Sequence, residues 1–398
     1  HGDIKGAFLS DTDTTNATYT TVADDWATAS AWTKQSSISV TSTGSGTSGT
    51  LSITGNGTGS NVYFFNPITV EANTDYVVSV TFGAENANDF FINNTQYSTT
   101  NKLLDINALS GSTRGGHFNS GSNTTLYIQG WQQSSTATTI TNITIQKVSE
   151  KDRSVNNKGL EVHGTITKSA VATGADLVAY SGFSSSNHFK QPYNSDLNFG
   201  TGDFSIMFWY KATVDDYTAQ CFLHRGDGGT GTWGSGKIIQ IEFNSTNLAA
   251  FLSESAFSSF DTVAIPGGTA ASGQWQHYTL IRRGTFVGAY LDGELKDSTS
   301  SSRDLSNTSA KTWIGERPNA SRPLDTTSLA LLRISASAPS DEQIKKIYED
   351  EKVLFQENAK ATLYGSSDAV TALAYDDSTN LLYAGTSSGR SEFQGLRR

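Results

Sequence analysis

Aromatic side chains stand next to amide or carboxylate side chains at three places that read as loops or strand ends. An aromatic face can stack on the apolar face of a sugar ring, while amide and carboxylate oxygens bind the hydroxyls. For each aromatic, the alternative is a place in the core or at an interface. The candidate ligand-binding residues are Trp233 in the glycine-rich segment 226–236, Trp131 with Gln129 and Gln132, and Tyr193 with Asn194 and Asp196.

Residue patterns for catalysis or metal binding do not occur in the sequence. Glu349, Asp350 and Glu351 are consecutive in a predicted helix, where neighbouring side chains point in different directions. The six histidines are isolated from one another, and no Cys/His spacing typical of zinc sites occurs. Segment 226–236 lacks the Lys-Ser/Thr pair of a phosphate-binding loop. We therefore expect no catalytic site, no metal site and no enzyme activity.

The composition is typical of an all-β protein. Runs of Thr, Ser, Asn and Gly separate short apolar stretches, and the 398 residues include 37 glycines and 6 prolines. The net charge of −10 argues against nucleic-acid binding. No apolar stretch approaches the roughly 18 residues of a membrane span. The single cysteine, Cys221, allows no intrachain disulfide, so we expect it in the core and expect stability to come from packing or assembly.

Segment 274–295, QWQHYTLIRRGTFVGAYLDGEL, predicts a hairpin of two antiparallel strands. Alternation puts His277 on one face of the first strand and Tyr278 on the other. Asp292-Gly293 predicts a tight turn at the end of the second strand. The segment resembles the W-x-H…L-Y-V-D-G signature of laminin-G-like and pentraxin-like modules. The resemblance implies a jelly-roll sandwich of the concanavalin A type, which usually binds rather than catalyses, and a structural role for His277.

Further segments in the same order support this resemblance. Residues 202–210, GDFSIMFWY, match the G-x-F-S…W strand of the family, and 313–315 and 329–335 match later strands. Glucanases of this fold carry an E-x-D-x-x-E strand, whose carboxylates lie on one face, and no such triplet occurs here. The fold class we predict is all-β, with two antiparallel jelly-roll sandwiches, one C-terminal helix and a terminal β-hairpin piece.

Residues 1–150 predict the first of the two sandwiches. The segments YVVSVTF, from Tyr76, and TNITIQKV, from Thr141, resemble two strands of family-4/9-type carbohydrate-binding modules. In that family an Asp that often helps to hold a structural calcium stands where this chain has Thr141. We therefore expect no cofactor, and nothing in the sequence supports calcium.

The rest of the chain divides into three parts. Residues 151–170 form a connector whose sequence GLEVHGTITKS resembles repeats of trimeric phage fibre shafts, the alternative being a domain-opening strand. Residues 171–360 form the laminin-G-like sandwich, closed by a helix over 339–360 with a capping box at Ser340 and Gln343. Residues 361–398 predict a hairpin similar to the edge of a propeller blade. Because a single hairpin is marginal alone, we expect it to pair with further strands or with another subunit. That partner surface would cover an apolar face formed by Leu373, Tyr375, Leu381 and Tyr383.

The order of the modules resembles structural proteins of tailed phages. It implies a fibre-type virion protein, located in the virion or outside the cell, that displays glycan-binding-type sandwiches for attachment to a host-surface glycan. The expected partners are copies of the chain, with a trimer favoured, and other virion proteins, without nucleic acid or a membrane span. The alternatives are a purely structural filament or decoration subunit, a secreted bacterial adhesin, and a non-catalytic part of a polysaccharide depolymerase.

Overall fold

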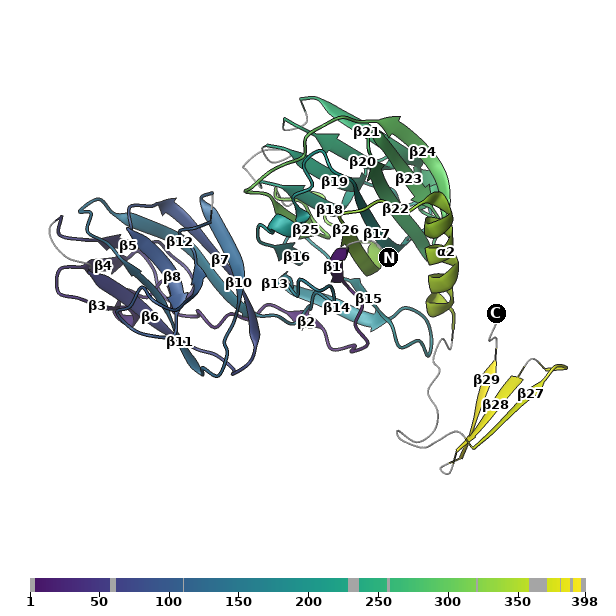
Figure 1. The fold of residues 1–398 in the computed structure, drawn as a ribbon, viewed down its shortest axis with the longest axis horizontal. Helices are drawn as coiled ribbons and strands as arrows, with labels where there is room; N and C mark the ends of the chain where they lie inside the picture. The colour runs from purple at the N-terminus through teal and green to yellow at the C-terminus, as the bar shows by residue number, and fades with distance from the viewer. Residues whose placement is uncertain are drawn as a thin grey trace. The chain divides into compact units, whose positions relative to one another are not determined.

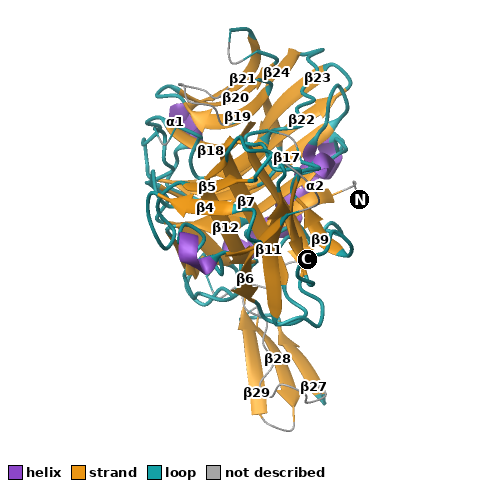
Figure 2. Cartoon of the chain, turned by 90° about the vertical axis from the view of Figure 1, so that its left-hand side faces the viewer, coloured by secondary structure: helices purple, strands orange, loops and turns teal. Residues whose placement is uncertain are grey.

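The computed structural model describes residues 4–57, 62–109, 111–227, 236–255, 258–319, 321–357, 371–379, 381–386 and 389–394. The chain divides into two compact units, one made of residues 1–169 and 178–350 and the other of residues 170–177 and 351–398. Antiparallel sheets make up nearly all of the described structure (Figures 1 and 2). The predicted all-β fold class is therefore confirmed. No helix among the described residues is long and apolar enough to cross a membrane.

The first sandwich packs two five-stranded sheets, ordered β10-β7-β12-β5-β4 and β3-β6-β11-β8-β9. Side chains from both sheets form one buried cluster, to which Val78 and Phe64 contribute from opposite sides. The strands are β3 (Thr33–Lys34), β4 (Ser39–Ser42), β5 (Leu51–Thr54), β6 (Tyr63–Thr69), β7 (Asp75–Ala84), β8 (Asp89–Asn93), β9 (Lys102–Asp105), β10 (Thr113–Asn119), β11 (Thr125–Trp131) and β12 (Thr138–Lys147).

The second sandwich packs a nine-stranded sheet, β2-β14-β15-β26-β17-β22-β23-β24 with β1 beside β26, on a seven-stranded sheet, β13-β16-β25-β18-β19-β20-β21. Its larger sheet contains β1 (Ile4–Phe8), β2 (Ala17–Thr18), β14 (Thr165–Ala170), β15 (Val178–Ser181), β17 (Phe204–Ala212), β22 (Gln276–Arg283), β23 (Phe286–Leu291), β24 (Glu294–Ser300) and β26 (Thr327–Ser335). Its smaller sheet contains β13 (Glu161–His163), β16 (His188–Gln191), β18 (Gln220–Gly226), β19 (Ile238–Phe243), β20 (Asn247–Ser253), β21 (Phe260–Pro266) and β25 (Lys311–Ile314).

The predicted hairpin is formed by β22 and β23, which pair from Tyr278 opposite Leu291 to Arg283 opposite Phe286. Tyr278 belongs to the core between the two sheets, whereas the buried His277 lies on the opposite face. Asp292 and Gly293 have φ values of 53° and 79°, which suit the tight turn into β24. Both the alternation and the turn chemistry are as the sequence predicts.

The N-terminal residues belong to the second sandwich, although the first sandwich follows them in the sequence. β1 pairs with β26, and β2 pairs with β14. The first sandwich is thus inserted between strands of the second, and the two crossing segments are joined where the Tyr19 N–H donates to the Gly164 carbonyl at 2.7 Å. Residues 161–170 form β13 and β14 within this sandwich, which corresponds to the domain-opening alternative. The ranges 1–150, 151–170, 171–360 and 361–398 remain predictions.

The predicted closing helix is α2 (Asp341–Glu351), followed by a short 3-10 turn, η3 (Lys352–Phe355). The capping box is formed, because the Ser340 N–H donates to Gln343 Oε1 at 2.8 Å and the Gln343 N–H donates to Ser340 Oγ at 3.3 Å. Tyr348 stacks on Trp209 of β17, with the ring centroids 5.7 Å apart. The other helical segments of the described chain are short: η1 (Ala29–Ala31), η2 (Ser195–Leu197) and α1 (Gly267–Ala270).

The second unit contains a three-stranded sheet of β27 (Ala372–Asp376), β28 (Leu381–Thr386) and β29 (Gly389–Gln394). The predicted hairpin is present as β27 and β28, and β29 adds a third strand that the sequence did not indicate. Leu373 and Tyr375 on β27 are 67% and 53% exposed.

The register of this sheet corrects one expectation. Leu373, Tyr375, Leu381 and Tyr383 had been expected on one apolar face. However, Leu381 lies opposite Asp376, and Tyr383 lies opposite Ala374. Because side chains directly opposite each other share a face, the four residues are divided between both faces of the sheet.

Candidate functional site

Aromatic side chains cover the outer face of the β3-β6-β11-β8-β9 sheet in the first sandwich. On β11, Trp131 lies opposite Tyr63 of β6, and Gln129 lies opposite Phe65. Residues between them on these strands, such as Phe64, point into the core. Alternation therefore places Tyr63, Phe65, Tyr127 and Trp131 on the face opposite the core. We call these four residues, together with Tyr97, the aromatic platform.

Tyr97 reaches this face from the loop between β8 and β9. Its ring meets Phe65 edge-on at 5.2 Å and Tyr63 at 6.2 Å between centroids. Phe65 also meets Tyr127 edge-on at 5.3 Å, so the rings form one continuous patch. Tyr97 is 43% exposed, and Tyr63, Tyr127 and Trp131 are partly exposed. These rings can therefore contact a ligand.

Hydrogen bonds from buried amide side chains hold the loop that carries Tyr97. The Tyr97 N–H donates to Gln129 Oε1 at 2.8 Å, and Gln129 Nε2 donates to the Ser98 carbonyl at 2.8 Å. Asn93 Nδ2 donates to the same carbonyl at 2.8 Å and to the Thr100 carbonyl at 3.0 Å. Tyr97 has a φ of 55°, an uncommon value for a bulky residue, which these bonds help to maintain.

A charged group borders the platform. Asp89 of β8 lies opposite Trp131, and its carboxylate is 2.8 Å from Lys102 Nζ. Asp105 is 2.9 Å from the same ammonium group, which lies 4.7 Å from the centroid of the Phe91 ring. Although burial opposes the effect, the two carboxylates raise the pKa of Lys102. The platform thus combines flat apolar surfaces with charged hydrogen-bonding groups at its border, a combination that suits a sugar.

Of the predicted residues in this sandwich, the structure places only Trp131 on the partly exposed surface. Gln129 lies on the same face but is fully buried and bonded to the Tyr97 loop. Gln132 is also fully buried, and its Nε2 donates to the carbonyls of Ile53, Ser134 and Thr136. The geometry gives both amides a structural role. Tyr63, Tyr97 and Tyr127 were not predicted from the sequence, although Tyr63 and Phe65 on one strand and Tyr127 and Trp131 on the other repeat at even spacing.

The predicted group in the second sandwich is bonded to the connector. Asn194 is buried and accepts from the Asp196 N–H at 3.0 Å at the start of η2. Lys158 Nζ donates to Asn194 Oδ1 at 3.1 Å and to Asp196 at 2.6 Å. Tyr193 is partly buried. These contacts join the connector to the second sandwich, and the structure does not bring the group near Trp131.

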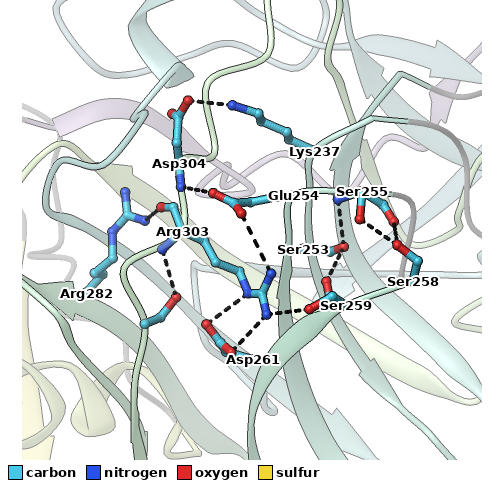
Figure 3. A network of polar contacts seen from close by, with 11 residues as sticks. Lys237, Ser253, Glu254, Ser255, Ser258, Ser259, Asp261, Arg282, Arg303 and Asp304 are labelled. Carbon is cyan, nitrogen blue, oxygen red and sulfur yellow. Dashed lines mark hydrogen bonds and ion pairs between the residues drawn. The ribbon is translucent and has the colours of Figure 1, made fainter.

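Trp233 lies outside the described residues. Among the described residues of the second sandwich, a network of polar contacts joins several loops (Figure 3). Arg303 forms two hydrogen bonds with the Asp261 carboxylate, at 2.9 and 3.1 Å. Lys237 pairs with Asp304, whose N–H donates to Glu254 Oε1 at 2.6 Å. The charged groups in this network are paired with one another, so its geometry indicates a scaffold for the loops.

The outer face of the seven-stranded sheet carries one carboxylate on β19, the strand beside β18. Glu242 accepts from Gln240 Nε2 at 2.6 Å and forms an ion pair with Arg322 at 2.5 Å. His224 Nδ1 lies 2.7 Å from Gln240 Oε1. Burial raises the pKa of Glu242 and lowers the pKa of His224 to about 4. Within the described part of the chain, no group of three or more His, Cys, Asp or Glu residues is arranged to hold a metal ion.

The comparison with protein families finds a match within the second sandwich. Residues 183–345 match the model of the concanavalin A-like lectin/glucanases superfamily. The laminin-G-like prediction is confirmed for this part of the chain. A search of curated proteins finds no match.

Several solved structures are similar at low identity. The binding domain of Paraclostridial Mosquitocidal Protein 1 has a TM-score of 0.41 and 16% identity, over 61% of this chain and 62% of that chain. The ligand-binding domain of botulinum neurotoxin serotype D, in complex with N-acetylneuraminic acid, has a TM-score of 0.41 and 13% identity, over 60% and 59%. Domain 4 of an extracellular arabinanase from Geobacillus stearothermophilus, in complex with arabinotriose, has a TM-score of 0.38 and 18% identity, over 50% and 92%. The chain thus spans about three-fifths of the length of the two toxin domains.

Proposed function

We propose that this chain is a non-catalytic, glycan-binding attachment protein, and that the aromatic platform of the first sandwich is its binding surface. The observation that carries the proposal is the cluster of Tyr63, Tyr97 and Trp131, three partly exposed rings on one sheet face. A soluble protein exposes such a cluster at a cost unless it meets a ligand. Asp89 and Lys102 at the border supply acceptors and donors for sugar hydroxyls.

The fold of the second sandwich supports the same proposal. Its concanavalin A-like family includes both lectins and glucanases. On the outer face of its seven-stranded sheet, β19 carries Glu242 and, two residues earlier, the amide Gln240, so this strand does not supply the pair of carboxylates that glycoside hydrolysis uses. This arrangement favours binding over catalysis. Trp233 remains a candidate contact residue.

A glycan array with the intact chain tests the proposal. We expect binding to a limited set of glycans, and we expect Trp131→Ala to weaken it, because a stacking surface is removed from the platform. Phe260→Ala is the matched control, since Phe260 is also exposed (44%) but belongs to the second sandwich. Equal array signals for the wild type and Trp131→Ala would contradict the proposal. Release of reducing sugar from a bound polysaccharide would favour the enzyme alternative.

We further propose that the chain acts as an oligomer, with a trimer favoured, in a virion fibre or at another site outside the cell. Two observations support this proposal. The order of the modules resembles that of phage structural proteins, and the C-terminal sheet exposes apolar side chains. This three-stranded sheet exposes Leu373 and Tyr375, and a sheet of this size needs a further packing surface. A filament or decoration subunit without a ligand is the alternative, and the glycan array separates the two.

A further inference from the structure

A lysine and two carboxyl side chains meet beside the segments that join the second sandwich to the inserted first sandwich. Lys168 of β14 lies with its Nζ 2.7 Å from Asp11 Oδ2 and 3.4 Å from Glu150 Oε1. Asp11 follows β1 and Glu150 follows β12, so the first sandwich separates Asp11 from the other two residues along the chain. We call Lys168, Asp11 and Glu150 the triad.

The triad is largely shielded from water. The side chains of Lys168 and Glu150 are only 5% and 4% exposed, whereas the Asp11 side chain is 29% exposed. Lys168 Nζ lies 5.6 Å from the centroid of the Tyr180 ring, and the Tyr180 hydroxyl is within hydrogen-bonding reach of the Glu150 carboxyl. Because buried charges are costly, such a site favours forms of the triad that carry fewer charges.

The two carboxyl groups of the triad differ in protonation. Burial raises the pKa of Glu150, which favours its neutral acid. Although burial opposes the effect, hydrogen bonds from Lys168 and from the Thr12 N–H lower the pKa of Asp11. Lys168 and Asp11 therefore form an ion pair. Transfer of one proton along their 2.7 Å contact gives a neutral amine and a carboxylic acid, and it removes two charges from the site.

We propose that the triad forms an intramolecular isopeptide bond between Lys168 Nζ and Asp11 Cγ. Asp11 is the acyl group because its carboxyl is the nearer of the two to the amine. Glu150 is the acid–base catalyst because its carboxyl is the more deeply buried one. The proposal is independent of the platform and of glycan binding, because it uses other residues on other elements.

The reaction is a condensation that requires no oxidant or reductant. The neutral amine of Lys168 attacks Asp11 Cγ while Glu150 donates a proton to the carbonyl oxygen, where negative charge develops. Glu150 then removes a proton from the nitrogen and gives it to one hydroxyl, which leaves as water. The proton of the other hydroxyl returns to Glu150. An Nζ–Cγ bond forms and a Cγ–O bond breaks, and the polar cavity beside Asp11, Glu150 and Tyr180 can hold the released water.

The bond would close a loop of the chain that contains the whole first sandwich. Asp11 and Lys168 are 157 positions apart. The single cysteine, Cys221, is buried and free, so no disulfide within the chain ties these segments together. A covalent tie at this place would keep the strands that hold the first sandwich from separating under a pulling force.

Two other lysine–carboxylate pairs serve as internal controls, because each lacks part of the triad. Lys158 lies 2.6 Å from Asp196, but the two side chains are 32% and 28% exposed. Lys190 lies 2.7 Å from the buried Glu161, whose other titratable partner is His163 rather than a carboxyl group. We therefore expect neither pair to form an amide.

Mass spectrometry of the denatured full chain tests the proposal. We expect the wild type to be lighter than its sequence by one water molecule, with a branched tryptic peptide that joins Lys168 to Asp11. Lys168→Met, which lacks the amine, should have the full sequence mass, and the control Lys158→Met should still lack one water. Samples taken during cell-free synthesis should show that Glu150→Gln forms the bond roughly 100-fold more slowly than the wild type.

The mass of the folded wild type decides the proposal, so the outcome does not depend on the folding of the variants. A wild type that shows a cooperative melting transition and has the full sequence mass would overturn it. A branch at Lys158 or Lys190 in place of Lys168, or a branch to Glu150 in place of Asp11, would also overturn it. Equal rates of bond formation in the wild type and Glu150→Gln would overturn the role of Glu150.

Discussion

At the scale of single residues, Gln129 gives the platform its shape without being accessible to a ligand. Its carboxamide accepts from the Tyr97 N–H and donates to the Ser98 carbonyl, which holds the loop against the sheet. Gln132, three positions later, is buried to the same extent but bonds to Ile53, Ser134 and Thr136. The two amides thus form a matched pair with different local partners.

We expect Gln129→Leu to loosen the loop around Tyr97 and to weaken glycan binding. Leucine cannot replace the hydrogen bonds, and the loop polar groups would lose about 1–3 kcal/mol of stabilisation. Hydrogen exchange should become faster over residues 94–101. In the control Gln132→Leu, faster exchange should be confined to residues near Ile53 and Ser134. Unchanged exchange over 94–101 in Gln129→Leu would show that the amide does not position the platform.

Three buried histidines predict loss of stability in acid. Burial lowers the pKa of His188 to about 3, of His224 to about 4 and of His277 to about 3. The unfolded chain binds protons at these positions below about pH 6.5, whereas the folded chain does so only near pH 3–4. The stability that neutral histidines contribute is therefore present above pH 6.5 and is lost as the pH falls toward 4.

His277→Phe tests this pH dependence. Both ring nitrogens of His277 are buried without a hydrogen-bond partner, so the apolar ring should be tolerated at about pH 7. Between about pH 6.5 and pH 4, the melting temperature should fall less in the variant than in the wild type, because one proton-uptake site of the unfolded chain is gone. Scanning calorimetry over this range measures both slopes. Parallel slopes would mean that His277 does not contribute.

Residue spacing predicted some of these roles and missed others. The turn at Asp292 and Gly293 and the burial of Cys221 follow from local sequence, because turn geometry and apolar alternation are local properties. The pairing of Asp11 with Lys168 and the meeting of Tyr97 with Tyr63 depend on which strands become neighbours. Nothing in the spacing along one chain specifies such neighbours.

At the scale of elements, helix α2 covers the outer face of the nine-stranded sheet. Met207, Ile281, Tyr290 and Ile344 form a small apolar cluster beneath it, separate from the main core. The helix is anchored at its start by the Ser340–Gln343 capping box and along its length by Tyr348 on Trp209. The first turn therefore helps to position the whole helix on the sheet.

We expect Ser340→Ala to lower the free energy of unfolding by about 1 kcal/mol, since the Gln343 N–H loses its acceptor. Ser340→Gly should lower the free energy of unfolding by only a few tenths of a kcal/mol, because glycine is also tolerated at this cap position. Urea denaturation followed by tryptophan fluorescence measures both. A loss for Ser340→Ala no larger than that for Ser340→Gly would show that the cap is not used.

The strand predictions were best where apolar residues alternate over long stretches. β7, β12, β17 and β22 were all expected at nearly the observed positions. Short strands rich in polar residues, such as β9 and β10, were missed because their burial pattern is weak. The pairing of β1 with β26 was also missed, since it joins segments more than 300 residues apart.

At the scale of the whole molecule, the C-terminal sheet leads to a prediction about assembly. Leu373 is two-thirds exposed on β27, and burial of such a side chain contributes roughly 1.5–3 kcal/mol. We expect multi-angle light scattering to give a trimer mass for the full chain and a lower mass for Leu373→Asp. Ser378→Asp, in the turn after β27, is the control and should leave the mass unchanged. A monomeric wild type with the C-terminal sheet resistant to proteolysis would contradict this assembly.

The central claim is that the aromatic platform binds a glycan, and titration calorimetry with the strongest ligand from the array tests it most directly. The wild type and Phe260→Ala should bind with equal affinity, while Trp131→Ala and Tyr97→Ala should each bind about tenfold more weakly, a loss of about 1.4 kcal/mol. All four proteins should have similar melting temperatures, because the altered rings are exposed or partly exposed. Equal affinity in all four proteins would contradict the claim.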